Sequence, residues 1–371
     1  MSTYPAVVID HGSYRIRAGF GGELTPRTNM LNAVGWPAYT DVATDGREFY
    51  VGYDAEVRRG VLNFTTPLRK GIVTRWDDVE RVLEYVFANE LRVPSDERYL
   101  LITEPQYTSN EQRGHMAEIL FEKFRVPAVY LAQQPALALY GSGRTSGMVL
   151  DCGSETVQAI PVWRGQVLGY ASSRMDFGGL TLSEFFARLM TERGHSFKTT
   201  SEMAFLRSMQ ERYCYAAYDF DAELTRAATT AEVDATFLLP DGQEVLMSSE
   251  RFRAVEPLFA PEQMGIDARG LPHLLLSTLM KCEVDARRTL IENVILCGGT
   301  SRFPGLPERL GKELDHLVPP GTVYSLSAPP DRDLTVWQGG SMLASSASFV
   351  QLSIPREQYY EVGATVVYKR G

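Results

Sequence analysis

VIDHGS at Val8–Ser13 and VLDCGS at Val149–Ser154 are two copies of one phrase, and this repeat decides the fold. The copies start 149 − 8 = 141 residues apart. Each is an apolar run that ends in Asp-x-Gly-Ser, the pattern of a buried strand entering a tight turn. A second alternating stretch follows each copy, RIRAGF at Arg15–Phe20 and VQAIPV at Val157–Val162. One copy alone indicates an ordinary hairpin, whereas the matched pair predicts two equivalent hairpins facing a shared ligand.

The residues of these turns predict that the ligand carries phosphates. Gly12 and Gly153 lack a Cβ atom, so they allow a positive φ and the close approach of a ligand. Backbone N–H groups around such turns form a nest for an anion. Ser13 and Ser154 can add hydroxyl donors.

The paired aspartates predict a metal ion beside those phosphates. Asp10 and Asp151 repel phosphate directly, because the charges have the same sign. A hydrated Mg²⁺ removes the conflict, since it keeps several waters and uses only one or two carboxylates. We therefore expect Asp10 and Asp151 to hold the metal through water.

A third glycine signature follows a predicted strand at 294–297. The stretch Cys297–Gly305 reads CGGTSRFPG, so Gly298, Gly299 and Thr300 form a strand-to-helix turn. Alone it indicates a plain turn. Beside the paired aspartate loops, its glycines predict a cradle on which a flat ring or ribose can pack.

The order of strands and helices indicates an α/β protein. We expect strands at 4–20, 100–105, 128–131, 147–172 and 294–297, and helices at 77–91, 110–124, 134–140, 201–217, 271–291 and from Thr181. Asp77 and Asp78 are expected to cap the first helix. Residues 32–64 form a small appended lobe with an Asp45-Gly46 turn at its tip. This alternation in two similar halves predicts two α/β domains with a cleft between them.

Composition excludes several other classes. The chain has 371 residues, 44% of them hydrophobic, with a net charge of −9 and a pI near 5.3. This charge argues against a nucleic-acid surface, and no apolar stretch approaches the ~20 residues needed to insert into a membrane. The cysteines and histidines show no metal-ligand spacing. We expect free thiols and a cytoplasmic location.

The three glycine elements, in this order, resemble the actin, Hsp70 and sugar-kinase superfamily. Further phrases resemble actin itself: Arg17–Phe20, Tyr50–Gly52, Gly71–Val73, Trp76–Asp78, Asn89–Val93, Leu139–Thr145, Thr191–Gly194, Leu239–Gln243, Glu250–Arg253, Met280–Cys282, Ala328–Pro330 and Val336–Ser341. The match runs from Val7 to Tyr368. The chain is similar to eukaryotic-type actin or a close actin-related protein, more than to the bacterial shape-determining actins.

The resemblance implies an α/β fold of the actin-like ATPase type, with two RNase H-like domains around a nucleotide cleft. Four subdomains follow by position: 1–31, 65–141 and 334–371 form subdomain 1, and 32–64 form subdomain 2. Residues 142–178 and 267–333 form subdomain 3, and 179–266 form subdomain 4.

The resemblance also implies ATP or ADP with Mg²⁺ as ligands, and a role for each matching residue. Gln134 positions the attacking water, and Gln158 stands where actin has a histidine thought to polarise that water. Arg207, Gln210 and Glu211 share one helix face. The implied nucleotide contacts are Gly12, Ser13, Tyr14, Arg17, Gly153, Ser154, Gly179, Arg207, Gln210, Glu211, Gly298, Gly299, Thr300 and Phe303.

Several positions depart from the pattern of actin. Ser154 replaces an aspartate, and Gln158 replaces the histidine, which puts the rate of hydrolysis in doubt. Arg17 and Asp333 each stand where actin has a lysine, and Lys70 stands where it has a modifiable histidine. Tyr14 and Glu155 replace glycines, so we expect stiffer loops. Binding of Mg-ATP is therefore the firmer expectation, and turnover is expected to be slow.

The resemblance further implies partners. The tip loop between Pro37 and Tyr50 is shorter than in actin, and Glu262 and Gln263 make the 260–270 loop more polar. A cleft for neighbours and regulators is implied at Tyr140, Gly143, Thr145, Leu343 and Leu352, although core packing would equally explain its apolar members. No nucleic acid and no membrane insertion are expected.

Three functions remain open at this point. The first is a filament-forming ATPase, in which head-to-tail contacts build a helix. The second is a non-polymerising actin-related subunit with nucleotide as a structural ligand, which Ser154 and Gln158 favour and the lack of insertions disfavours. The third is a sugar kinase, which the actin-like phrases along the whole chain disfavour.

Overall fold

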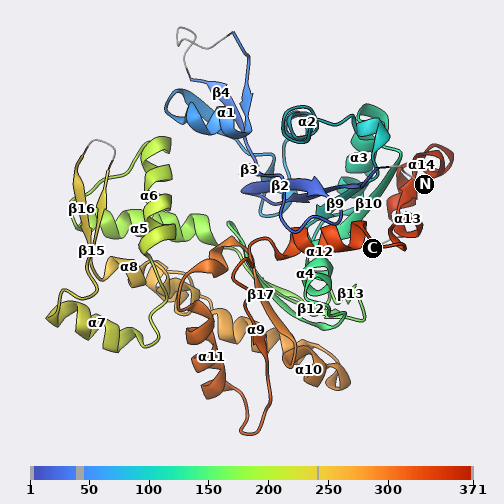
Figure 1. Cartoon of the computed structure of the whole chain (residues 1–371). Coiled ribbons are helices and arrows are strands. Elements are labelled where there is room, and N and C mark those ends of the chain that lie inside the picture. Colours follow the sequence, from blue (N-terminus) through green and yellow to red (C-terminus); the bar gives the residue numbers. More distant parts are fainter. Residues whose placement is uncertain (1–3, 39–45, 240–241, 369–371) are drawn as a thin grey trace. The chain divides into compact units, whose positions relative to one another are not determined.

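The computed structural model describes residues 4–38, 46–239 and 242–368. The chain divides into two compact units, which we call unit 1 and unit 2. Unit 1 comprises Met1–Ser146, Val162–Gly169 and Leu334–Gly371, and unit 2 comprises Gly147–Pro161 and Tyr170–Asp333. Each unit carries a mixed sheet with helices packed on it, as the alternating pattern predicted (Figure 1).

The main sheet of unit 1 has six strands in the order β19-β10-β9-β1-β2-β3. The strands are β1 Val7–His11, β2 Arg15–Phe20, β3 Thr28–Leu31, β9 Leu100–Glu104, β10 Ala128–Gln133 and β19 Ile354–Pro355. The central strands β1, β9 and β10 run parallel, and the others pair antiparallel with their neighbours. The carboxyl ends of the three parallel strands therefore meet at one edge, which is where α/β sheets place their ligand sites.

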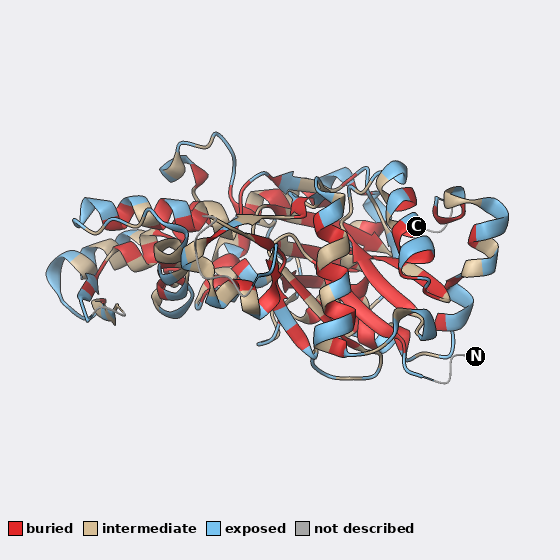
Figure 2. Cartoon of the chain, turned by 90° about the horizontal axis from the view of Figure 1, so that it is seen from above, coloured by how far each residue is buried: buried red, intermediate tan, exposed pale blue. Residues whose placement is uncertain are grey.

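Alternate residues of β1 enter two different cores. Val7 and Ile9 belong to one apolar cluster, whereas Val8 belongs to another that includes Trp337. This is the two-residue period of a strand with both faces covered. Figure 2 shows the strands of this sheet as buried. The Trp337 indole is itself fully buried and donates from Nε1 to the Val8 carbonyl oxygen at 3.1 Å.

Helices cover both faces of this sheet. On the face of Val7 lie α2 Trp76–Tyr85 and α3 Asn110–Glu118, which continue as π-helical turns over Val86–Leu91 and Ile119–Lys123. On the face of Val8 lie α4 Gln134–Gly141, α12 Thr335–Ala344 and α13 Phe349–Leu352. Unit 1 also contains α14 Arg356–Val362, which directly follows β19.

The segment in which we expected a small lobe contains a separate small sheet within unit 1. It pairs β5 Tyr50–Val51, β4 Val34–Pro37 and β6 Leu62–Thr65, with α1 Gly52–Val57 beside them. A short hairpin, β7 Leu68–Arg69 and β8 Ile72–Val73, follows. Asp45 of the predicted tip turn lies outside the described residues, as does most of the tip.

The sheet of unit 2 repeats the order of unit 1. Strands β12-β11-β17-β18 are neighbours, just as β2-β1-β9-β10 are. The strands are β11 Gly147–Cys152, β12 Val157–Trp163, β14 Ser173–Met175, β17 Val294–Cys297 and β18 Leu326–Ser327, and β13 Gln166–Val167 pairs with the end of β12. The strands β11, β17 and β18 run parallel. The duplicated phrase therefore marks a duplicated hairpin on a duplicated sheet.

The helices of unit 2 lie between and after these strands. They are α5 Gly179–Glu192, α6 Thr200–Tyr213, α7 Phe220–Thr229, α8 Glu250–Arg253, α9 Leu271–Lys281, α10 Val284–Ile291 and α11 Leu306–Leu317. A hairpin of β15 Ala235–Leu238 and β16 Glu244–Met247 lies among them.

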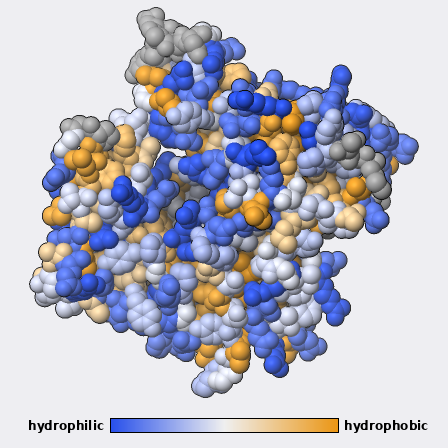
Figure 3. Space-filling model, in the orientation of Figure 1, coloured by the Kyte–Doolittle hydropathy of each residue, from blue (hydrophilic) through white to orange (hydrophobic). Residues whose placement is uncertain are grey.

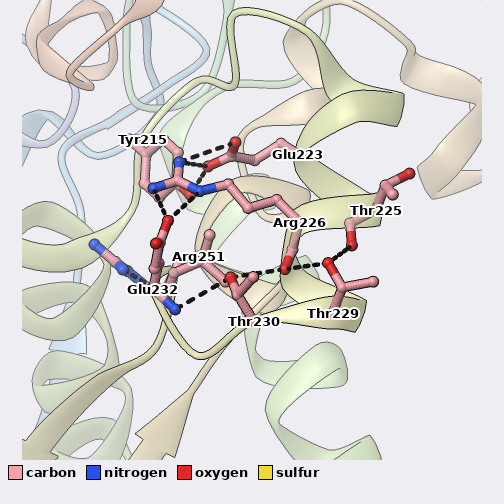
Figure 4. Close-up of polar contacts among 9 residues, drawn as sticks. Tyr215, Glu223, Thr225, Arg226, Thr229, Thr230, Glu232 and Arg251 are labelled. Atoms are coloured by element: carbon pink, nitrogen blue, oxygen red, sulfur yellow. Dashed lines mark hydrogen bonds and ion pairs between the residues drawn. The ribbon is translucent and has the colours of Figure 1, made fainter.

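Polar contacts hold α7, which has no buried residue. The Tyr215 hydroxyl donates to Glu223 at 2.6 Å, and Arg226 pairs with Glu223 at 3.4 Å and with Glu232 at 3.0 Å (Figure 4). Arg251 donates to the backbone oxygens of Tyr213 and Val233. Burial and the neighbouring Glu223 raise the pKa of Tyr215, so this hydroxyl keeps its proton.

Three local predictions need correction. The helix expected over 201–217 ends at Tyr213, and the one over 271–291 is two helices, because Cys282 between them is extended (φ −78°, ψ 157°). Asp78 does not cap α2. Its carboxylate is fully buried and bonds Arg75, Arg81 and the Thr65 hydroxyl, so it ties α2 to β6 instead.

Candidate functional site

The first predicted phosphate loop joins β1 to β2. Asp10 and His11 end β1, the turn is Gly12–Tyr14, and Arg17 lies opposite Asp10 in the hairpin register. Gly12 does not use the positive φ that glycine allows. A Cβ atom there would lie 2.8 Å from the Arg15 carbonyl oxygen, so glycine is needed because the turn closes on itself.

A buried polar cluster surrounds the Asp10 carboxylate, which is 3% exposed. The Thr103 hydroxyl donates to Asp10 Oδ1 at 2.9 Å, and the Gln134 amide nitrogen donates to the same oxygen at 3.1 Å. Arg17 pairs with the other oxygen, Oδ2, at 3.2 Å. The strand ends of β1 and β9 and the start of α4 thus converge on one carboxylate, and the structure brings Asp10, Arg17 and Gln134 together.

Two further residues hold the first loop in place. Asn32 donates from Nδ2 to the Gly12 carbonyl oxygen at 2.8 Å, and its backbone N–H donates to the Tyr14 carbonyl oxygen at 2.9 Å. The backbone N–H of Gly71 donates to Ser13 Oγ at 3.2 Å. Since Ser13 accepts this bond, its own hydroxyl hydrogen remains available to an anion.

His11 adds no charge to this site at neutral pH. Burial lowers the pKa of its imidazole to about 4, and its side chain lies within the protein at 2% exposure. The prediction that His11 is structural is consistent with this neutral, buried state. Positive charge and hydrogen-bond donors in this loop therefore come from Arg17, the Ser13 hydroxyl and backbone N–H groups.

The second predicted loop repeats the closure of the first. The Gly153 N–H donates to the Thr156 carbonyl oxygen at 2.9 Å, and a Cβ on Gly153 would lie 3.1 Å from that oxygen. Gly153, like Gly12, lacks a positive φ. The same offset of three residues, 12 to 15 and 153 to 156, closes both turns. The requirement for glycine is again the close approach of backbone.

The second loop is tied to two other predicted site elements of unit 2. The Gly153 carbonyl oxygen accepts from the Gly179 N–H at 3.1 Å and from the Thr300 hydroxyl at 2.7 Å. The Leu180 N–H donates to the Ser154 carbonyl oxygen at 2.7 Å. The N-terminus of α5 and the Gly-Gly-Thr turn are therefore built onto this loop.

The two glycines after β17 have different surroundings. Gly298 has φ +87° and ψ 153°, and a Cβ there would contact Asp151 Oδ1 and the Cys152 carbonyl oxygen. A Cβ on Gly299 would meet nothing within 4 Å. Gly298 is thus required by packing against the Asp151 loop, whereas the space beside Gly299 is open, as a cradle for a flat ligand requires.

The predicted adenosine-side residues differ in how accessible their side chains are. Gln210 on α6 is 3% exposed, and the Ser183 hydroxyl of α5 donates to its Oε1 at 2.6 Å. Glu211 is exposed and Arg207 half-buried, while Phe303 is 8% exposed. Gln210 therefore joins α6 to α5, and Arg207 and Glu211 present the more accessible part of the predicted face.

A comparison with known families decides which family this arrangement belongs to. The family model described as Actin matches residues 1–371. The chain belongs to the actin family. Its α/β architecture, with two similar sheets and a duplicated Asp-x-Gly-Ser hairpin, is the actin-like fold that the resemblance implied.

Three of the positions that depart from the actin pattern have defined surroundings in this actin-family chain. Gln158 donates from Nε2 to the Thr156 hydroxyl of its own hairpin at 3.1 Å. Asp333 pairs with Arg302 at 3.4 Å. Lys70 is exposed in a left-handed conformation, φ 48°, directly before Gly71.

The predicted partner surface lies within unit 1. Close packing of α4 on α12 brings Tyr140 at the end of α4 near the helix that carries Leu343, and a Cβ on Gly141 would meet the Gly339 nitrogen at 3.1 Å. Leu343 packs partly on the Trp337 core. The exposed apolar residues of α12 and α13 are Met342, Val350 and Leu352. Gly143 and Thr145 are exposed on the segment after α4.

The donor set of the actin-family chain fits a metal held through water. Within residues 4–38, 46–239 and 242–368, no group of three or more His, Cys, Asp or Glu is placed to hold a metal ion directly. Asp10 Oδ1 already accepts from two donors, so Oδ2, which accepts from Arg17, keeps acceptor capacity for a metal-bound water.

Sequence reasoning missed Thr103 and Asn32. Thr103 follows the apolar run Leu100–Ile102 at the end of a parallel strand, and the rule that ligand sites lie at such ends could have found it. Asn32 carries no comparable signal, because it reaches Gly12 only through the pairing of β2 with β3.

In the part of the chain that the structure describes, no helix is both long and apolar enough to span a membrane.

Proposed function

We propose that this actin-family chain binds Mg-ATP, assembles head to tail into filaments and hydrolyses ATP slowly. One observation carries the proposal: Asp10, Thr103 and Gln134 form a buried hydrogen-bonded cluster at the closed Gly12–Ser13 turn. Burying these polar groups costs desolvation free energy, which their hydrogen bonds to one another offset. A polar cluster kept at such a cost is typical of a functional site. Binding of a nucleotide with its metal would give both aspartate loops the same function.

Phosphate binding is assigned to both glycine turns. Backbone N–H groups of the two turns and the Ser13 hydroxyl donate to phosphate oxygens. Arg17 contributes its positive charge beside Asp10, with a planar fork in place of the point charge of lysine. Bound Mg²⁺ would neutralise phosphate charge, and Asp10 and Asp151 would hold it through its waters.

Hydrolysis is assigned to an ordered water that Gln134 orients. Phosphoryl transfer needs little covalent chemistry from the protein, because positioning and charge stabilisation supply most of the effect. A neutral amide can orient water without being a strong base. Gln158 cannot act as an imidazole would, and Ser154 adds no carboxylate, so the expected turnover is slow.

Assembly is supported by exposed apolar side chains on two surfaces. The first is Met342, Val350 and Leu352 on α12 and α13 of unit 1. The second is the β15–β16 hairpin of unit 2, where Leu238 is 64% and Leu246 is 46% exposed; Figure 3 shows apolar atoms gathered at this hairpin. Contacts between unlike surfaces of successive copies build an open filament when the rotation from copy to copy does not close a ring.

Sedimentation with Mg-ATP, combined with phosphate release, tests assembly. We expect the native chain to pellet and to release phosphate after it assembles. Leu352→Asp should shift the chain to the supernatant, while Leu317→Asp is the matched control, since these leucines are 37% and 38% exposed. A native chain that stays in the supernatant at high concentration in every nucleotide state would refute assembly.

Nucleotide titration tests the site itself. We expect Asp10→Ala and Asp151→Ala to weaken Mg-ATP binding at least about tenfold, since each removes a charged partner of the metal's water shell. Asp96→Ala is the control, because Asp96 is exposed on a short turn. Unchanged affinity in both site variants would show that the nucleotide binds elsewhere.

A second candidate function is a non-polymerising actin-related subunit that keeps ATP as a structural ligand. The Gln158 amide favours it, because it bonds Thr156 within its own hairpin and lacks an imidazole's capacity to polarise water. Tight Mg-ATP binding without pelleting and without phosphate release would support this candidate over the first.

A further inference from the structure

Thr103 is the centre of the polar cluster in unit 1. Its Oγ1 receives the His11 backbone N–H at 2.9 Å and lies 2.9 Å from Asp10 Oδ1 and 3.3 Å from Gln134 Nε2. The side chain is 4% exposed. Its place follows from the register of β1 and β9, because Asp10 and Thr103 come one step after the paired residues Ile9 and Ile102.

The direction of each hydrogen bond in this cluster is fixed by chemistry. A backbone N–H can only donate, so Thr103 Oγ1 must accept from His11. An ionised carboxylate can only accept, so the single Thr103 proton goes to Asp10. The Gln134 amide must then turn its NH₂ group toward Asp10 and Thr103. Its carbonyl oxygen Oε1 is left as the end that can accept a proton from another group.

We propose that Thr103 is a positioning residue for the ATPase reaction, because it fixes Asp10 and thereby sets the Gln134 amide with Oε1 presented to the attacking water. This inference rests on the proposed function. A water that donates to Oε1 becomes a better nucleophile and keeps both lone pairs, whereas a reversed amide would donate to the water, occupy one lone pair and make it a poorer nucleophile. The orientation of one amide thus sets how readily the bound water reacts.

The two oxygens of Asp10 have separate tasks in this arrangement. Oδ1 accepts from Thr103 and Gln134, and Oδ2 accepts from Arg17. Thr103 therefore acts on the side of the carboxylate that faces Gln134. Removal of its hydroxyl takes away one of the two acceptors that hold the Gln134 amide nitrogen and one donor to Asp10 Oδ1, so the amide is held less firmly. The Arg17 side stays intact, so nucleotide binding should suffer much less than turnover.

Thr103→Val tests the inference, because valine keeps the branched shape and removes the hydroxyl. We expect single-turnover phosphate release to slow about 10- to 100-fold, with Mg-ATP affinity within about threefold of the native value. Thr103→Ser restores the hydroxyl and should recover most of the rate. Thr335→Val is the matched control, since Thr335 is a 4% exposed threonine of the same unit whose hydroxyl has no hydrogen-bond partner.

Two further measurements test the mechanism apart from turnover. In nucleotide-free protein, the His11 amide should exchange with deuterium faster in Thr103→Val than in Thr103→Ser, because its acceptor is lost. The double variant Thr103→Val with Gln134→Ala should hydrolyse no more slowly than Gln134→Ala alone, since Thr103 acts through Gln134.

Several outcomes would overturn the inference. Native phosphate release by Thr103→Val, failure of Thr103→Ser to recover the rate, or additive losses in the double variant would each refute the positioning role alone. A native chain that binds Mg-ATP and never hydrolyses it would refute the ATPase reaction and the positioning role together. A native chain that binds no nucleotide would show that the proposed function itself had failed.

Discussion

Two adjacent glycines, Gly298 and Gly299, should respond in opposite ways to substitution by alanine. Gly298 has φ +87° and ψ 153°, a region that residues with a side chain rarely adopt, and an added Cβ would come within 3.0 Å of Asp151 Oδ1 and the Cys152 carbonyl oxygen. Gly299 has open space around its Cβ position. The backbone strain alone costs about 1–3 kcal/mol, and the clash with backbone adds about 1–3 kcal/mol more. Gly298→Ala should therefore lower the free energy of unfolding by about 2–6 kcal/mol.

Urea unfolding of nucleotide-free protein measures this loss. Gly299→Ala should unfold within about 0.5–1 kcal/mol of the native chain, the range of an ordinary glycine substitution. The two variants should also differ in the way they affect ligand binding. Gly298→Ala displaces Asp151, so the metal dependence of nucleotide binding should weaken. Gly299→Ala places a methyl group where we propose that the nucleoside packs, so affinity should fall for nucleoside and nucleotide alike.

Equal stability of the two alanine variants would refute this reasoning, because it would mean that the chain relaxes around Gly298 at no cost. Loss of stability in Gly298→Ala with unchanged metal dependence would separate the two steps. The packing argument would then hold, and the assignment of Asp151 to the metal's water shell would be wrong.

Two other predictions concern buried titratable groups. A thiol reagent should modify none of the four free cysteines in the native chain and all of them after denaturation, because all four are buried. Burial raises the pKa of Cys152, Cys214 and Cys282, which keeps their thiols protonated. Rapid modification of the native chain would contradict the packing of these sites. Burial also raises the pKa of Glu256, beside Arg309, from 4.5 to about 7. The stability this carboxyl contributes is fully present below pH 4.5 and is lost as pH rises through about 7. The stability advantage of the native chain over Glu256→Gln should therefore shrink by up to about 3 kcal/mol across that window, and a constant difference in urea unfolding would count against it.

Sequence reasoning located the hairpins because their signals are local. An apolar run before Asp-x-Gly-Ser specifies a strand and a turn without reference to the rest of the chain. The repeat at Val8–Ser13 and Val149–Ser154 then specified the duplication of the sheet order, since the same elements follow each copy. Periodicity also placed α2 and α3, whose last turns differ only in being π-helical.

The errors came from residues whose role is set by distant parts of the chain. Asp78 stands near the start of α2, where an acidic residue is typical of a helix cap. Its buried carboxylate instead bonds Thr65 of β6 and two arginines, and these bonds stabilise it more than a capping position would. Sequence reasoning also left open why Gly12 and Gly153 must be glycine, and the structure shows that each is constrained by the carbonyl oxygen three residues later. Thr103 was passed over because its partners lie 93 and 31 residues away.

The duplicated hairpins place different chemistry at equivalent positions. Arg17 and Gln158 lie seven residues after their aspartates, 17 − 10 and 158 − 151. Thr103 lies near the end of β9, the strand beside Asp10. The register of β11 with β17 pairs Asp151 with Cys297, whose thiol lies 3.9 Å from the carboxylate. A hydroxyl is a strong donor and a thiol is a weak one. Asp10 is therefore oriented mainly by hydrogen bonds, whereas Asp151 is confined by the close backbone of Gly298. This difference explains why the informative substitution is Thr103→Val in unit 1 and Gly298→Ala in unit 2.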